Sequence, residues 1–305
     1  MKTEILITGA TGTTGQYAIA HLLKKGKKVR AMVRSLDARS KKLESMGVEI
    51  VEGDFLDIKS LRKALDGIKR AYFLYPFKDH LPKAAALFSK AAKEKNVEMV
   101  IEMSQMGAQD ESTSPATQNH VITENIFNWA DVGAVHIRPG LFAWNYLGFA
   151  APTVADHFKF YYPHTEAKYT IVHPKDIGEV VAEILADDDK NKHIGETYEI
   201  SGSQVYSAED ITKDIGELIN HEVEYVPVTV DQWIDAVKDH PTINEFLAKH
   251  LREFSIEVSE GRFNKITTVV KNITGHEPRS FKQYIEEYKE VFLPIEAKNL
   301  SLNKN

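Results

Sequence analysis

The sequence predicts an open α/β fold built on a doubly wound parallel sheet, and three observations support this prediction. Apolar, β-prone segments alternate with amphipathic segments through the first half of the 305-residue chain. The first apolar segment runs directly into a glycine-rich turn that opens a helix. Parallel strands need a crossover between them, so this alternation requires a parallel sheet. We therefore expect a Rossmann-type domain over residues 1–150.

The pattern of each segment justifies the predicted elements in order. Apolar runs predict strands over residues 5–8, 28–34, 48–51, 70–75, 98–103 and 134–138. Amphipathic spacing predicts a helix after the glycine turn, another after residues 53–57, and helices over residues 38–46, 81–94 and 117–129. The helices lie between successive strands, as a six-stranded doubly wound sheet requires.

The regular alternation ends at Pro139-Gly140. We expect residues 151–293 to form a smaller mixed α+β region that packs on the first domain and covers the substrate. Its pattern predicts short strands near 158–161 and 197–200 and helices near 174–186, 208–219, 230–237, 243–257 and 280–292. The aromatic spacing in the last helix indicates core packing, and we expect the polar tail 294–305 to fray.

The composition excludes several classes of function. Lys plus Arg is 38 and Asp plus Glu is 44, so a net charge of −6 gives no basic surface for nucleic acid or anionic lipid. The chain has no cysteine, which excludes disulfides, thiolate catalysis and cysteine-ligated metal, and we expect no metal site. Without an apolar run of about 18 residues or a leader pattern, we expect a cytoplasmic protein that does not enter a membrane.

The turn from Gly9 to Gly15 predicts a phosphate-binding loop. Its spacing is G-x-x-G-x-x-G, with Gly9, Gly12 and Gly15 as the glycines. Glycines let the backbone approach a pyrophosphate, whose charge is then bound by the free N–H groups at the helix N-terminus. The loop residues Thr11, Thr13 and Thr14 belong to the same predicted site. The alternative is an ordinary strand-to-helix turn.

Arg34 indicates which dinucleotide the loop would bind. It ends the second predicted strand, 19 residues after Gly15. An acidic residue at this place binds the 2′-hydroxyl of NAD, whereas an arginine pairs with the 2′-phosphate of NADP. The sequence therefore predicts NADP(H), with a solvated surface charge as the alternative. The nearby Arg39, Lys41 and Lys42 are interpreted as the polar face of the next helix.

Further candidates follow the other strands, because ligands of an open α/β sheet bind beyond the carboxyl ends of its strands. Asp54 and Phe55 are expected near the adenine. Tyr75, Pro76, Phe77 and Phe142 are expected to line the nicotinamide end, and Ser104 and Pro139 are further candidates for cofactor contacts. Aromatic residues after strands also often only plug a loop.

The acid/base equipment of a common alcohol dehydrogenase is absent from the sequence. None of the 12 tyrosines has a lysine four residues later, although such a lysine is what lowers the tyrosine pKa in those enzymes. The corresponding helix carries His120 and Glu124, which could form a proton relay, although a surface i,i+4 pair is the more common explanation. Ser104 could hydrogen-bond a substrate or cap a turn. His120 and Ser104 are the catalytic candidates.

These residues together resemble the NmrA-like, atypical branch of the short-chain dehydrogenase/reductase superfamily. The resemblance covers most of the chain and is carried by Ile5–Gly12, Val29–Arg34, Gly53–Phe55, Ile137–Phe142, Asn145–Leu147 and Thr274–Phe281. Within the branch, His120–Asn125 and Asn145–Leu147 are most similar to type-2 quinone oxidoreductases, NADPH-dependent enzymes of the bacterial cytosol. Asn125 stands where many of those enzymes carry a lysine.

The resemblance implies an NADPH-dependent reductase of quinones or similar small, flat acceptors. The branch also contains regulators without turnover, so the alternative is an NADP(H)-binding redox sensor that acts on a protein partner. A sugar-nucleotide epimerase is disfavoured because it also needs the Tyr/Lys pair. The sequence leaves open the acceptor and whether the chain forms a homodimer.

Overall fold

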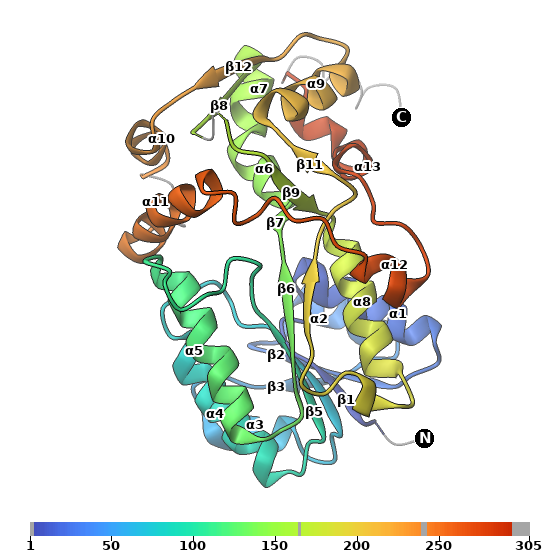
Figure 1. Cartoon of the computed structure of the whole chain (residues 1–305). Coiled ribbons are helices and arrows are strands. Elements are labelled where there is room, and N and C mark those ends of the chain that lie inside the picture. The colour runs from blue at the N-terminus through green and yellow to red at the C-terminus, as the bar shows by residue number, and fades with distance from the viewer. Residues whose placement is uncertain (1–2, 164–165, 239–242, 295–305) are drawn as a thin grey trace. The chain divides into compact units, whose positions relative to one another are not determined.

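The computed structural model describes residues 3–163, 166–238 and 243–294 (Figure 1). The chain divides into two compact units. The first unit contains the chain up to Pro139 together with Pro174–Ile200 and Thr268–His276. The second contains Gly140–His173, Ser201–Thr267 and the chain from Glu277. The first unit is therefore assembled from three separate segments of sequence.

The first unit is built on a seven-stranded sheet with the order β10-β6-β5-β4-β1-β2-β3, in which all neighbours are parallel. The strands are β1 (Ile5–Ile7), β2 (Val29–Val33), β3 (Glu49–Glu52), β4 (Arg70–Phe73), β5 (Met99–Met103), β6 (Ala134–Pro139) and β10 (Thr197–Ile200). The predicted doubly wound, Rossmann-type fold is confirmed. The strand order reverses between β1 and β4, and this switch point is where such folds bind ligands.

Helices cover both faces of this sheet (Figure 1). They are α1 (Thr13–Lys24), α2 (Ala38–Ser45), α3 (Ile58–Ala64), α4 (Leu81–Glu94), α5 (Pro115–Ala130), α8 (Pro174–Ala186) and α12 (Val269–Thr274), with a 3₁₀ turn η1 (Lys190–Lys192). Helices α3, α4 and α5 pack in a row on one face, and α1 and α8 pack together on the other. A Cβ on Gly178 of α8 would lie 2.6 Å from Tyr17 Cβ, so this glycine lets α8 approach α1.

An aromatic core fixes α4 and α5 to the sheet. The Phe73 ring of β4 lies 5.0 Å, between centroids, from both Phe88 of α4 and Phe127 of α5. All three side chains are fully buried. Such aromatic contacts stabilise beyond their buried area. The loops that follow β4 and β5 therefore leave from a rigid base.

The second unit is a mixed α+β structure with short strands. Its strands are β7 (Leu141–Phe142), β8 (Lys159–Tyr162), β9 (Tyr169–Val172), β11 (Val205–Tyr206) and β12 (Glu224–Pro227), paired in the orders β11-β9-β7 and β12-β8. Its helices are α6 (Trp144–Phe149), α7 (Ala151–His157), α9 (Ala208–Ile219), α10 (Val230–Val237), α11 (Glu245–Ser259) and α13 (Phe281–Glu287), followed by a 3₁₀ turn η2 (Lys289–Phe292). Tyr146 is central to its core, with ring contacts to Phe160 and Phe281.

Three details differ from the prediction. The strand expected near 197–200 exists, but it pairs in parallel with β6 and is the seventh strand of the main sheet. The helix expected over 280–292 ends at Glu287, because Tyr288 leaves helical backbone geometry and a 3₁₀ turn then carries Phe292 into the core. The division expected at residue 150 also differs from the observed units, since residues 174–200 and 268–276 cluster with the first unit.

The predicted frayed tail, from residue 295 onward, lies outside the described residues. Among the residues described, no helix combines the length and apolar character needed to cross a membrane.

Candidate functional site

The glycine-rich loop joins β1 to α1 and depends on its three glycines. Gly9 has a φ of +60°, in the left-handed region that favours glycine. The Gly12 N–H donates to Gly9 O at 2.9 Å and closes a tight turn. A Cβ on Gly15 would lie 2.3 Å from the same Gly9 O, and one on Gly12 would lie 3.1 Å away. Any side chain at Gly15 would therefore push α1 away from the loop.

The N-terminus of α1 has unused hydrogen-bond donors. Gly12 is its N-cap and offers no side chain, whereas Asp37 caps α2 and Asp57 caps α3. A helix without a cap leaves first-turn N–H groups free, and the helix dipole adds positive potential. Gly12 and Thr13 are exposed, Thr11 is half-buried, and Thr14 and Gly15 are buried. This arrangement suits an anion such as a pyrophosphate.

Arg34 lies directly after β2, where the sequence predicted a phosphate-binding cation. Its side chain is exposed and makes no ion pair or hydrogen bond within the described part of the chain. Arg39, in contrast, binds the Asp37 carboxylate at 2.6 Å. Of these two arginines, Arg34 is the one whose charge is available to a ligand.

Residues from three strand ends meet beside Arg34. The Phe55 ring lies 5.1 Å from the Tyr75 ring in an edge-to-face contact, and both rings are half-buried. Burial raises the pKa of Tyr75, the charges of Asp54 and Asp79 raise it further, and the charge of Arg34 lowers it. The structure thus brings together Arg34, Asp54, Phe55 and Tyr75, as the carboxyl ends of neighbouring parallel strands should.

Asp54 is partly engaged by its own loop. Its Oδ1 accepts a hydrogen bond from the Leu56 N–H at 2.8 Å. Pro76 and Phe77 follow Tyr75 and are exposed. The structure places these residues at the sheet edge without assigning them a ligand, so their cofactor roles remain predictions.

Ser104 and Pro139 end two neighbouring strands. The Ser104 N–H donates to Ile137 O at 2.8 Å, and the Met106 N–H donates to Pro139 O at 2.9 Å. Ser104 is 2% exposed, and its hydroxyl helps to lower the pKa of Glu124, although the two groups are not in hydrogen-bonding geometry. Phe142 belongs to β7 of the second unit and is half-buried.

His120 and Glu124 do not form a surface pair with each other, and that interpretation is wrong. Both side chains turn toward the sheet because α5 packs there. Glu124 is 6% exposed and receives two hydrogen bonds from Arg138, at 2.8 and 2.5 Å. Burial raises the pKa of Glu124, but the hydrogen bonds and charge of Arg138, with smaller contributions from Ser104 and His136, together outweigh burial and leave this pKa below its usual range. His120 instead faces Glu102, with Nδ1 3.7 Å from Oε1.

Sequence reasoning missed three members of this buried cluster, namely Glu102, His136 and Arg138. Glu102 of β5 is fully buried, and its Oε2 lies 3.2 Å from His136 Nδ1. His136 Nε2 lies 3.0 Å from Asn128 Oδ1. The available signal was a carboxylate inside an apolar central strand, next to a strand in which His136 and Arg138 alternate with apolar residues.

Two sets of side chains are close enough to reach a single metal ion, although the sequence predicted no metal site. They are Glu102 with Glu124 and His136, and Asp176 with Glu179 and His276. In the first set Arg138 already supplies a positive charge to Glu124. In the second His276 Nε2 lies 2.8 Å from Glu179 Oε2. Partners within the protein therefore already satisfy part of each set.

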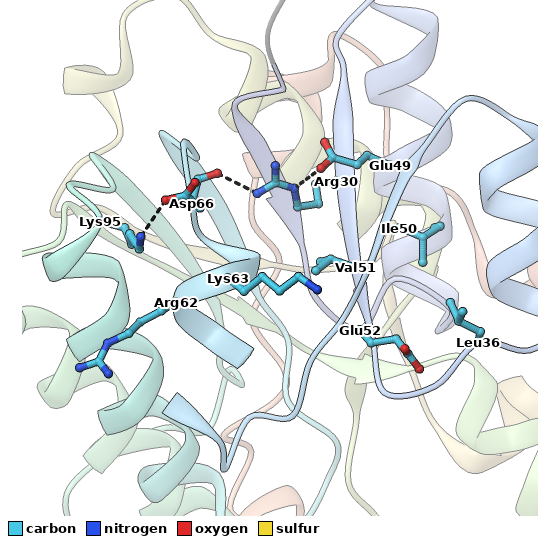
Figure 2. A pocket seen from close by; sticks show the side chains of 10 residues that line it. All are labelled: Arg30, Leu36, Glu49, Ile50, Val51, Glu52, Arg62, Lys63, Asp66 and Lys95. Atoms are coloured by element: carbon cyan, nitrogen blue, oxygen red, sulfur yellow. Dashed lines mark hydrogen bonds and ion pairs between the residues drawn. The ribbon is translucent and has the colours of Figure 1, made fainter. Parts of the chain in front are cut away.

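A hollow of about 690 Å³ in the first unit lies along the edge strand β3 and not at the glycine loop (Figure 2). Arg30 binds Glu49 at 2.8 Å, and Lys95 binds Asp66 at 2.7 Å. Figure 2 shows these charges paired across the hollow. Because these four charges bind one another and the hollow lies away from the glycine loop, we do not take this hollow as the candidate site.

Comparison with known proteins assigns the family. The model of the NmrA-like family matches residues 1–288, and the chain belongs to this family. It is 25% identical over 291 residues to an NAD(P)H azoreductase of Xenophilus azovorans, covering 94% of this chain and 99% of the relative. It is 24% identical over 278 residues to quinone oxidoreductase 2 of Escherichia coli, covering 89% of this chain and 94% of the relative.

Solved structures share the fold. The NADPH complex of the E. coli quinone oxidoreductase QOR2 has a TM-score of 0.82 at 23% identity, covering 93% of this chain and 99% of that one. The NADP(H) complex of Citrobacter sp. triphenylmethane reductase has a TM-score of 0.81 at 22% identity and the same coverage. The negative transcriptional regulator NmrA in complex with NAD has a TM-score of 0.77 at 16% identity, covering 94% and 95%. Enzymes and a regulator therefore share this architecture.

Proposed function

We propose that the chain is an NADP(H)-binding oxidoreductase that passes a hydride from NADPH to a quinone or a similar small, flat acceptor. The observation that carries the proposal is Arg34, an exposed arginine without an ion pair among the described residues, at the end of the strand beside an uncapped glycine loop. This combination matches a dinucleotide whose pyrophosphate and 2′-phosphate both carry charge.

The residues present fit the cofactor. A Cβ on Gly9 would meet the Leu74 side chain and one on Gly15 would meet the Gly9 carbonyl, so the glycines keep the loop tight against the N-terminus of α1, where a pyrophosphate would bind. Arg34 would bind the 2′-phosphate as a charge-assisted pair. Asp54 and Phe55 would contact the adenine side. When bound, NADPH supplies a hydride. The azoreductase and quinone oxidoreductase relatives, and the neighbours solved with NADPH or NADP(H), support this choice of cofactor.

The chain itself would orient the acceptor, exclude water and supply a proton. A quinone needs little acid/base help because it accepts a hydride readily, so the absent Tyr/Lys pair does not exclude this reaction. His120 is the proposed proton donor. Ser104 is the other candidate, although its side chain is only 2% exposed.

The test is NADPH oxidation by purified protein with a panel of small quinones, after binding of NADPH and NADH has been measured on the same sample. Saturable turnover with NADPH, well above the uncatalysed rate and above that with NADH, is expected. Tight NADPH binding without turnover on any quinone would overturn the proposed reaction and leave the cofactor assignment standing.

A redox sensor is the second candidate, and Asn125 is the observation that favours it. Its amide donates to Val121 O at 3.1 Å within α5, so it brings no charge to the site where related enzymes have a lysine. The likeness to the regulator NmrA points the same way. A sensor predicts that NADP changes protease cleavage in the loops after Tyr75 or Phe142 without any turnover. Equal cleavage with and without NADP would contradict it.

A further inference from the structure

We infer that Glu102 is a positioning residue that holds the His120 ring with its proton on Nδ1, so that Nε2 is free to deliver a proton to the reduced acceptor. This inference rests on the proposed function for its chemistry. Its structural part, the state of the His120 ring, can be measured without any turnover.

The first observation is the position of the two groups. Glu102 has no exposed surface, and its Oε1 and His120 Nδ1 are both buried without a hydrogen-bond partner. They face each other at 3.7 Å. This is longer than a hydrogen bond of about 2.7–3.2 Å. Catalytic hydrogen bonds are often long in the free protein and tighten when ligands bind.

The second observation is the exposure of the ring. The His120 side chain is 13% exposed, and its Nδ1 is buried. The exposed surface therefore belongs to the rest of the ring, which carries Nε2. One edge of the imidazole faces a buried carboxylate and the other can reach solvent or ligand, which is the arrangement of a histidine oriented by an acidic partner.

The third observation is the charge of the cluster around Glu102. The charged and titratable groups that interact with it are Tyr72 from β4, His120 and Glu124 from α5, and His136 and Arg138 from β6. Glu124 is paired with Arg138, and no lysine or arginine forms an ion pair with Glu102 among the described residues. A buried carboxylate oxygen without a hydrogen-bond donor is costly, and Glu102 Oε1 is such an oxygen, so the facing His120 Nδ1 is the group that would donate to it.

His120 rather than His136 can pass a proton onward. His136 is 4% exposed and both its ring nitrogens face acceptors, Glu102 Oε2 at 3.2 Å and Asn128 Oδ1 at 3.0 Å. Its ring is held in place and has no free nitrogen. His120 has one nitrogen toward Glu102 and one on its accessible edge, so only His120 can pass a proton out of the cluster.

The proton balance of the reaction requires such a donor. A quinone becomes a hydroquinone when it gains one hydride, which brings two electrons and one hydrogen, and one proton; NADPH is oxidised to NADP⁺. The imidazolium of His120 would break its Nε2–H bond as the acceptor oxygen forms its O–H bond. The remaining neutral ring keeps its proton on Nδ1, against Glu102, and takes a new proton on Nε2 from water.

The deciding experiment is NMR of the ¹⁵N-labelled holo-protein with NADP⁺ bound. It is recorded about two pH units above 6.5, the ordinary pKa of a histidine side chain. Two-bond ¹H–¹⁵N correlations show which ring nitrogen carries the proton, and His120→Gln assigns the signal. We expect a proton on Nδ1 of His120. A proton on Nε2 alone in the wild-type protein overturns the inference, and this reading requires no variant of Glu102.

Two variants sharpen the result. Glu102→Leu removes the acceptor, so the His120 proton should move to Nε2, whereas His136→Gln leaves the Glu102–His120 contact and should not move it. His21 is an internal reference, since its Nε2 lies 2.6 Å from Glu183 Oε1 and its proton should stay on Nε2 throughout. An unchanged Nδ1 proton in folded Glu102→Leu would also overturn the inference.

Turnover then connects the ring state to catalysis. Glu102→Leu and His120→Gln should each lower kcat by about 10²-fold with little change in KM, and the double variant should be no slower than either single variant. If no quinone is turned over, the proposed function fails while the NMR reading still decides the role of Glu102. If turnover is present but the Nδ1 proton is absent, only the inference about Glu102 fails.

Discussion

The carboxyl edge of the sheet in the first unit has two regions, one with unpaired polar and charged groups and one in which charged groups are paired. At the β1–β2 end, α1 has no side-chain cap and Arg34 has no ion pair among the described residues. At the β5–β6 end, Glu102, Glu124 and His136 are buried and Arg138 is half-buried; Glu102 faces His136, and Glu124 is paired with Arg138. Free charges and free N–H groups suit the binding of a charged ligand, whereas paired charges inside the protein stabilise the fold or position other side chains. His120 is the exception, because it belongs to the second region and keeps one ring edge accessible.

The largest change in stability is expected from replacing Arg138. Replacing it in Arg138→Met leaves Glu124 buried without its cation, close to Glu102, and should lower the free energy of unfolding by about 3–5 kcal/mol. Urea unfolding measures this change. The double variant Glu124→Gln with Arg138→Met should recover most of the loss, because no charge is then left unpaired. A double variant as unstable as Arg138→Met would contradict this account.

The glycine loop should be the next most sensitive place. In Gly15→Ala the new Cβ meets a backbone oxygen at 2.3 Å, and overpacking of this kind should cost about 3 kcal/mol and weaken NADPH binding. Gly47→Ala is the control, since its Cβ meets no atom within 4 Å and only its φ of +87° is unfavourable, at about 1 kcal/mol. Equal unfolding midpoints for the two variants would show that the loop tolerates a side chain.

Arg34 should affect binding without affecting stability. Arg34→Glu removes a charge-assisted contact and adds repulsion, so NADPH affinity should fall by about 10- to 100-fold while NADH affinity changes little. The unfolding free energy should stay within about 0.5 kcal/mol of the wild type. Arg39→Gln is the matched control because Arg39 is already bound to Asp37. Unchanged NADPH affinity in Arg34→Glu, measured by titration, would end the assignment of Arg34.

The smallest expected effect is on the acid limb of stability, which is the decrease in the free energy of unfolding at low pH. The pKa of Glu124 is lowered in the folded protein relative to its unfolded value of 4.5. Glu124 therefore contributes stability above pH 4.5, and this contribution is lost as the pH falls through the pKa of Glu124 in the folded protein. Unfolding of the wild type and of the Glu124→Gln, Arg138→Met double variant, followed from pH 6 to about pH 3, should show a shallower acid limb in the double variant. Identical slopes would mean that the pair does not contribute to acid unfolding.

Much of the first unit, and helices α9 and α10 of the second, could be predicted from the sequence because these elements are local and strongly patterned. The bounds predicted for the helices over 81–94, 174–186, 208–219 and 230–237 match those observed for α4, α8, α9 and α10. The glycine loop was recognisable because a strand, a tight turn and a helix follow one another without interruption. The roles of its residues in binding a cofactor are still predictions.

The missed features depend on contacts between distant residues. β7 and β11 have two residues each, too few to show a period, and they exist because β9 pairs with both. Glu102 is charged in a strand that is otherwise apolar, and its partner His136 is 34 residues away. Only the register between β5 and β6 shows that the two share a face. For the same reason His120 and Glu124, one turn apart, were paired with each other rather than with the sheet.

The order in which the chain is made gives the contact between α1 and α8 a further consequence. α8 packs on α1, with Gly178 against Tyr17 and Ala18, and β10 adds the last strand beside β6, yet both follow Pro139 by at least 35 residues. At about 5–20 residues per second, residues 140–200 take about 3–12 s to synthesise. During that time the nascent sheet lacks its edge strand β10, and the apolar face of α1 is not covered by α8. A fragment that stops at residue 150 would keep both defects permanently and should aggregate.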